Sequence, residues 1–123
     1  MANPYPDMLL SGQALYPNKP PNPNQLISMN GQFTLIMQQD GNLVLYYTPT
    51  SSTQRTKIWA TNTAGRAVQE ALMQTDGNFV LYDYTPMPLW SSNTAGYPGS
   101  YLVLQNDGNL VIYKPIAVWA TGT

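Results

Sequence analysis

The chain has 123 residues, a length that suits one compact domain with its own hydrophobic core. Charged residues make up only 9% of it and the formal net charge is −1, so it lacks the basic field that holds nucleic acid or an anionic membrane surface. It contains no Cys and no His, which excludes disulfides, thiolate nucleophiles, Cys/His zinc sites and the usual general base within this sequence.

These numbers predict a single domain over residues 1–123 with no nucleic-acid partner, and we expect no cofactor. Without Cys and His, a metal could be held only by oxygen ligands. The first residues lack the basic stretch and apolar run of a secretory signal, and no apolar run approaches membrane-spanning length. We therefore expect no membrane insertion. The expected location is the cytoplasm or release by a non-standard route, or secretion if a signal has been removed.

The predicted elements are short strands. Met8–Leu10 is a candidate first strand, and the proline-rich stretch 16–24 that follows favours an extended surface loop. Leu26–Ser28 resumes a strand, Asn30 and Gly31 turn it, and residues 33–38 form the next strand. No stretch of the chain has the 3.6-residue period of a helix.

A nine-residue motif, Q-x-D-G-N-x-V-x-Y, follows at residues 38–46 and returns at 74–82 and 105–113. In a β-strand, residues two apart project from the same face. The fixed Gln, Asp, Asn, Val and Tyr of each copy therefore form one chemical surface that is repeated three times.

The parity of the side chains predicts the register of each motif hairpin. If Gln38 and Asn42 are cross-strand partners, the loop between them holds three residues, and Gly41 takes the left-handed position that commonly ends such a loop. The second and third copies repeat the pattern. The apolar residues of odd number then face the core: Leu35, Met37, Leu43 and Leu45.

A second repeated unit carries the only three tryptophans, in the segments Trp-Ala-Thr-Asn-Thr, Trp-Ser-Ser-Asn-Thr and Trp-Ala-Thr-Gly-Thr. Both units recur at intervals of roughly 30 residues, which indicates an all-β body of pseudo-threefold symmetry. We expect Trp59, Trp90 and Trp119 to meet at the threefold axis as structural core. The alternative role is stacking on a ligand.

Three of the six carboxylates occupy the same motif position, Asp40, Asp76 and Asp107. Turn chemistry explains an Asp-Gly pair, but it does not explain the Gln, Val and Tyr around it. Read as chemistry, the motif offers a carboxylate acceptor, amide donors and acceptors, a phenolic hydroxyl and one small apolar contact. This combination is complementary to a sugar, in which adjacent hydroxyls surround an apolar C–H patch.

The unbroken motifs and the tryptophan segments resemble the monocot mannose-binding lectins of the snowdrop-agglutinin type, over nearly the whole chain from about Leu9 to Thr123. The resemblance implies an all-β fold, the β-prism II, with three four-stranded antiparallel sheets in pseudo-threefold symmetry. It also implies one shallow, metal-independent α-mannose site in each sheet.

Carried over by position, the resemblance implies that Asp40 and Asn42 bind the axial 2-hydroxyl that distinguishes mannose from glucose. Gln38 would bind the 3-hydroxyl and Tyr46 the 4-hydroxyl, with Val44 under the ring carbons. The same roles fall to two further sets of residues: Gln74, Asp76, Asn78, Val80 and Tyr82, and Gln105, Asp107, Asn109, Val111 and Tyr113.

The resemblance further implies a homodimer in which C-terminal strands are exchanged, here by Ala117–Thr123. A single exposed site with four or five hydrogen bonds would bind a monosaccharide at about the millimolar level, so function depends on multivalency toward mannose-rich glycans or glycoproteins. The chain departs from the family in two long loops, 16–24 and 48–56, which would extend or obstruct neighbouring sites. Gly41 also stands where many plant relatives carry a Cys.

Other functions remain open from the sequence. A glycoside hydrolase needs two carboxylates roughly 5–9.5 Å apart, whereas each motif supplies one, so we expect no enzyme activity. A lectin-like bacteriocin or a defence or insecticidal protein would use the same sites against another target. In the last alternative, the chain is a structural prism whose polar faces bind nothing.

Overall fold

The computed structural model describes residues 5–17, 22–116 and 119, and all regular elements in this part of the chain are β-strands, as predicted. The predicted strands near Met8, Leu26 and Phe33 are present. The strands are β1 (Met8–Leu9), β2 (Ala14–Leu15), β3 (Gln25–Ile27), β4 (Phe33–Met37), β5 (Leu43–Tyr47), β6 (Thr56–Ala60), β7 (Val68–Met73), β8 (Phe79–Asp83), β9 (Pro88–Ser91), β10 (Tyr101–Leu104) and β11 (Leu110–Tyr113).

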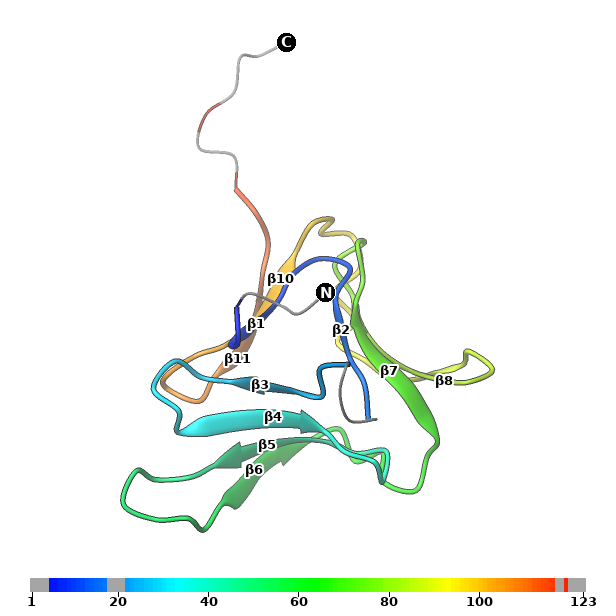
Figure 1. Cartoon of the computed structure of the whole chain (residues 1–123). Coiled ribbons are helices and arrows are strands. Elements are labelled where there is room, and N and C mark those ends of the chain that lie inside the picture. The colour runs from blue at the N-terminus through cyan, green and yellow to red at the C-terminus, as the bar shows by residue number, and fades with distance from the viewer. Residues whose placement is uncertain (1–4, 18–21, 117–118, 120–123) are drawn as a thin grey trace.

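The strands form three antiparallel sheets that enclose a common core like the sides of a triangular prism (Figure 1). Two sheets have four strands, in the orders β3-β4-β5-β6 and β2-β7-β8-β9. The third has three strands in the described residues, in the order β1-β10-β11. The predicted all-β prism is confirmed, with one sheet a strand short of the expected four in this part of the chain.

The sheets share one plan. The motif hairpin is central in both four-stranded sheets and forms one side of the three-stranded sheet. In each sheet an N-terminal strand pairs with the first strand of the hairpin: β3 with β4, β2 with β7, and β1 with β10. In two sheets a strand that carries a tryptophan, β6 or β9, pairs with the other side. The strand β2 was not predicted, because two residues next to a proline-rich loop give too little pattern.

The core is formed by the side chains that the alternation assigned to it. Leu35, Met37, Leu43 and Leu45 are all buried, as are their counterparts in the second sheet. In the third sheet Leu102 and Leu104 are buried, whereas Leu110 and Ile112 are partly buried and pack against the core. The shared core is therefore built from one face of each sheet, which leaves the opposite face of each hairpin for polar side chains.

The prediction for the tryptophans is only partly right. The rings of Trp59 and Trp90 meet edge to face at 5.7 Å between centroids, and Trp90 contacts Phe79 at 6.0 Å. Trp59 is nevertheless 37% exposed, and Trp119 is 79% exposed. The assignment of Trp119 to the core is wrong for the single chain, because within the described residues no strand pairs with the outer edge of β11.

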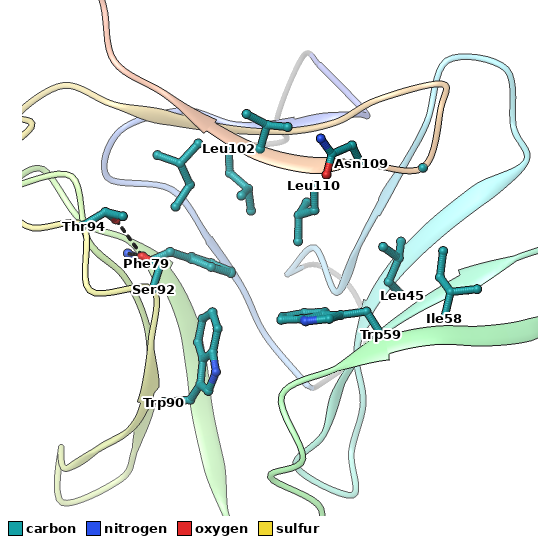
Figure 2. A pocket seen from close by; sticks show the side chains of 13 residues that line it. Leu45, Ile58, Trp59, Phe79, Trp90, Ser92, Thr94, Leu102, Asn109 and Leu110 are labelled. Carbon is teal, nitrogen blue, oxygen red and sulfur yellow. Dashed lines mark hydrogen bonds between the residues drawn. The ribbon is translucent and has the colours of Figure 1, made fainter.

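A cavity of about 640 Å³ opens where the third ring was expected. Figure 2 shows Trp59 and Trp90 on one side of this cavity and Leu102 and Leu110 of the third sheet on the other. The expected exchange segment 117–123 lies outside the described residues apart from Trp119.

Candidate functional site

The three motif hairpins have the predicted three-residue loop. The backbone N–H of Gln38 donates to the carbonyl of Asn42 at 3.0 Å, and Gly41 donates back to Gln38 at 3.1 Å. The same two bonds recur in the second and third copies. Gly41 has a φ of 93°, in the left-handed region that glycine enters without a steric penalty.

Each motif loop of the two complete sheets packs against the turn that follows the tryptophan strand. The N–H of Gly65 donates to the carbonyl of Asp40 at 2.7 Å, and a Cβ atom at Gly41 would lie 2.1 Å from the carbonyl oxygen of Arg66. The backbones approach so closely that only glycine fits at this position. The position of Asp40 is therefore fixed by two segments and not by the hairpin alone.

Within each copy the Gln and Tyr side chains meet on the outer face. In site 1, the set that begins with Gln38, the Gln38 Nε2 donates to the Tyr46 hydroxyl at 3.1 Å. In site 2, the set that begins with Gln74, and in site 3, the set that begins with Gln105, the Tyr hydroxyl donates to Gln Oε1 instead. The structure therefore brings the Gln and the Tyr of each set together.

The motif aspartates are exposed acceptors held by the backbone. In all three sites one carboxylate oxygen accepts from the N–H of the motif Asn at 2.9 Å. In sites 2 and 3 the motif Gln also donates to the carboxylate, at 3.0 Å to Asp76 and at 3.2 Å to Asp107. These hydrogen bonds, the backbone one foremost, hold the pKa of Asp76 and of Asp107 below the ordinary 3.8. Both groups are thus ionised acceptors near neutral pH.

The motif Asn is oriented by hydroxyl groups of the tryptophan segment. Asn42 Oδ1 accepts from the Thr61 hydroxyl at 3.3 Å and from the Thr63 N–H at 3.2 Å. Ser92 and Thr94 do the same for Asn78, both at 3.2 Å. Because the amide oxygen is engaged by the protein, the Nδ2 group is left to donate to a ligand.

The sequence reasoning missed these hydroxyl residues as part of the site. The available signal was the pair of hydroxyl side chains at the second and fourth positions after each tryptophan: Thr61 and Thr63, Ser92 and Thr94, Thr121 and Thr123. The third pair lies outside the described residues.

The motif valines of sites 1 and 2 are more buried than expected for side chains that lie under the ring carbons of a sugar. Val44 is 1% exposed and Val80 is 2% exposed, whereas Val111 is half-buried. The Gln–Tyr hydrogen bond is present in all three sites, so this bond does not decide how far the Val is covered. In sites 1 and 2 the valine side chain is therefore almost inaccessible to a ligand, and polar groups supply most of the accessible surface of the site.

The sites are shallow. A cavity of about 410 Å³ lies beside Gln74 and Asp76, with Gly12, Leu72 and Thr75 at its walls. No group of three His, Cys, Asp or Glu side chains suited to a metal ion occurs among the described residues. Within the same residues, no helix has the length and apolar character needed to cross a membrane.

Comparison with known proteins adds to this geometry, although no family model matches the chain. A mannose-specific lectin of Narcissus pseudonarcissus is 46% identical over 77 residues, which are 62% of this chain and 59% of that protein. The chain therefore spans about three fifths of the length of this curated relative.

Two solved structures are similar along almost their entire length. The mannose-specific agglutinin from snowdrop (Galanthus nivalis) bulbs, complexed with methyl-α-D-mannoside, is 42% identical with a TM-score of 0.70, over 95% of this chain and 96% of that one. A lectin from Allium sativum is 36% identical with a TM-score of 0.72, over 94% of this chain and 99% of that one.

Proposed function

The chain belongs to the monocot mannose-binding lectins of the snowdrop type, and on that premise we propose that it binds α-linked mannose through three metal-independent sites. The family is one of lectins and not of enzymes, as expected from the single carboxylate in each motif. The proposed ligands are mannose-rich glycans or glycoproteins.

The paired acceptor and donor at the motif Asp and Asn is the observation that carries the proposal. The ionised Asp76 accepts from a sugar hydroxyl, while Asn78 Nδ2 donates to the same oxygen. Such a pair fixes the position of one hydroxyl and rejects a sugar in which that hydroxyl points elsewhere. The axial 2-hydroxyl of mannose is the group that we assign to it.

The remaining polar groups suit the adjacent hydroxyls. The hydrogen bond between Gln and Tyr in each site opens to accept the 3-hydroxyl at Gln and the 4-hydroxyl at Tyr. Because a protein bond is exchanged for bonds to the ligand, the net gain is small. A single site should bind a monosaccharide at about the millimolar level, and avidity for clustered mannose should arise from several sites on one particle.

We further propose that two chains form a dimer by exchanging residues 117–123. The outer edge of β11 is unpaired within the described residues, and the cavity beside it is lined by the apolar side chains of Trp59, Trp90 and Leu110. Trp119 is exposed on its own chain and matches these two tryptophans in the repeat. In the dimer, Trp119 of the partner fills the cavity and its segment forms the fourth strand.

The turn residues of the repeat support the same strand conformation for the third segment. Asn62 and Asn93, which lie between the two hydroxyl residues, have φ values of 58° and 57°. The corresponding residue of the third segment is Gly122, which enters the left-handed region still more readily. The third segment is therefore suited to the turn that β6 and β9 make at their ends.

The binding proposal is tested by titration calorimetry with methyl-α-D-mannoside. We expect Asp40→Ala, Asp76→Ala and Asp107→Ala each to delete one site, and the triple variant to bind nothing while its circular dichroism is unchanged. Methyl-α-D-glucoside, which has an equatorial 2-hydroxyl, is the control ligand and should not bind. Mannoside binding by the triple variant would show that the carboxylates are not ligand groups.

A further inference from the structure

The three sites share five side chains but differ in what lies beside the tyrosine. Directly opposite residues on antiparallel strands share a face of the sheet, so the register identifies these neighbours. Tyr46 has Thr34 on one side and Lys57 on the other; Tyr82 has Glu70 and Pro88; Tyr113 has Tyr101 on its described side.

Among the described neighbours of the three tyrosines, only those of site 1 are cations. The guanidinium carbon of Arg55, from the long loop 48–56, lies 4.0 Å from the centre of the Tyr46 ring, and Lys57 is directly opposite Tyr46 on β6. Two of the five Lys and Arg residues of the chain therefore flank one tyrosine. Both side chains are exposed, and neither forms an ion pair with a carboxylate in the described residues.

The stacking of Arg55 on Tyr46 leaves its charge available to a ligand. When a guanidinium lies over an aromatic ring, the flat face of the guanidinium contacts the ring. The N–H donors at the edge of the guanidinium then remain free to bind another group. The planar fork of these donors matches the oxygen atoms of a phosphate group. Arg55 and Lys57 thus form a basic rim at the Tyr46 end of site 1.

We propose that site 1 selects a mannose that carries a phosphate on its 6-hydroxyl. This inference rests on the proposed function, in which Tyr46 contacts the 4-hydroxyl. In a pyranose the exocyclic carbon 6 is attached to carbon 5, next to carbon 4, so a 6-phosphate extends on the Tyr46 side of the ring. There it meets Arg55 and Lys57 while the 2-hydroxyl stays at Asp40 and Asn42.

The other two sites lack this preference for physical reasons. At site 2 the half-buried Glu70 stands opposite Tyr82 and repels a phosphate at the same place. At site 3 the neighbour is the uncharged Tyr101, whose ring lies 6.0 Å from that of Tyr113. The neighbour of the motif tyrosine is therefore basic in site 1, acidic in site 2 and aromatic in site 3.

The test uses the full chain with Asp76→Asn and Asp107→Asn, so that only site 1 remains. Mannose, mannose 6-phosphate, mannose 1-phosphate and glucose 6-phosphate are titrated by calorimetry at low ionic strength. We expect mannose 6-phosphate to bind about three- to thirtyfold more tightly than mannose, the range for one or two exposed charge pairs. The preference should shrink as salt is added, because exposed charges are screened. Mannose 1-phosphate, with its anion at another ring position, should show no such gain, and glucose 6-phosphate should not bind.

The double substitution Arg55→Gln and Lys57→Gln, added to the same background, should reduce the ratio of the two affinities to about one. Lys114→Gln is the control: it removes a positive charge that also lies over a tyrosine ring, that of Tyr97, and it should leave the ratio of the two affinities unchanged. The inference is overturned if mannose binds but the 6-phosphate gives no gain, or if the gain survives the double substitution. If neither mannose nor mannose 6-phosphate binds, the proposed function itself fails at site 1, and the inference fails with it.

Discussion

The sheet of site 1 and the sheet of site 3 carry the same motif but, within the described residues, differ by one strand. In site 1, Asn42 is 8% exposed, Val44 is buried and Tyr46 is half-buried. In site 3, Asn109 is exposed, Val111 is half-buried and Tyr113 is 42% exposed. The difference follows the strand after the hairpin, which is β6 in the first sheet, whereas no strand of the described residues takes that place in the third.

The comparison separates what the hairpin does from what the fourth strand does. The bonds of Asp107 and Tyr113 to Gln105, and the bond from the Asn109 N–H to Asp107, are all present in site 3. The hairpin alone therefore places Gln, Asp and Tyr. Partners for the Asn amide oxygen come from the segment that follows the adjacent strand, as Thr61 and Thr63 show in site 1, and the Val is buried where that strand is present.

The largest effect is expected at the tryptophans. Trp90→Ala should lower the free energy of unfolding by about 3–5 kcal/mol, because it removes an indole packed on Phe79 and Trp59 and enlarges the cavity beside them. Denaturant unfolding by fluorescence measures this loss.

Trp119→Ala is the matched variant. In a solution dilute enough to keep the chain monomeric, Trp119→Ala should change the free energy of unfolding by less than about 0.5 kcal/mol, because the side chain is exposed. Equal losses for Trp90→Ala and Trp119→Ala in the monomer would contradict the exposed position of Trp119.

The next effect concerns the hydroxyl groups under the motif. Thr63→Val should destabilise the chain by about 1–3 kcal/mol, because the buried Thr63 hydroxyl donates to the Gly41 carbonyl at 2.5 Å and that acceptor would lose its partner. Thermal unfolding measures the change.

Thr123→Val is the equivalent change in the third repeat. In the monomer this substitution should leave the thermal stability unchanged. In the dimer it should weaken the association of the two chains and the affinity of site 3 for mannose. A loss of stability in the monomer would mean that the segment already docks on its own chain.

Removal of residues 117–123 tests the link between dimer and site 3. We expect a monomer in sedimentation velocity, unchanged affinity at sites 1 and 2, and about tenfold weaker binding at site 3, equal to about 1.4 kcal/mol. Site 3 is isolated by Asp40→Asn and Asp76→Asn. Full affinity at site 3 in the truncated chain would show that the hairpin alone makes a complete site.

The smallest effect concerns the titration of the motif aspartates. Because the folded-state pKa of Asp76 is depressed, its stabilising contribution is complete above the unfolded pKa of about 3.9 and is lost as the pH falls through the lower folded value. Carboxyl-carbon NMR should find Asp76 more than half ionised at pH 3.8.

Gln74→Ala should raise the pKa of Asp76 only part of the way to 3.8, because the backbone N–H of Asn78, the larger cause, remains. The pKa of Asp107 is the internal control and should not move. A return of Asp76 to 3.8 in this variant would show that the backbone bond contributes nothing.

The sequence by itself determined what depends on alternation and on short turns. The burial of Leu35 and Met37, the three-residue loop ending at Gly41 and the meeting of Gln38 with Tyr46 all follow from positions a few residues apart. Each of these features is set by the two-residue period of a strand or by the backbone freedom of one glycine, so each can be predicted locally.

Only the tertiary structure decided which distant segments come together. It placed the short β2 beside β7, turned the Asn42 amide oxygen toward Thr61, set Arg55 over Tyr46, and left Trp119 exposed instead of at the axis. The physical reason is that these contacts join residues of different strands and loops. Their free energy depends on packing across the whole prism, and no local pattern in the chain records it.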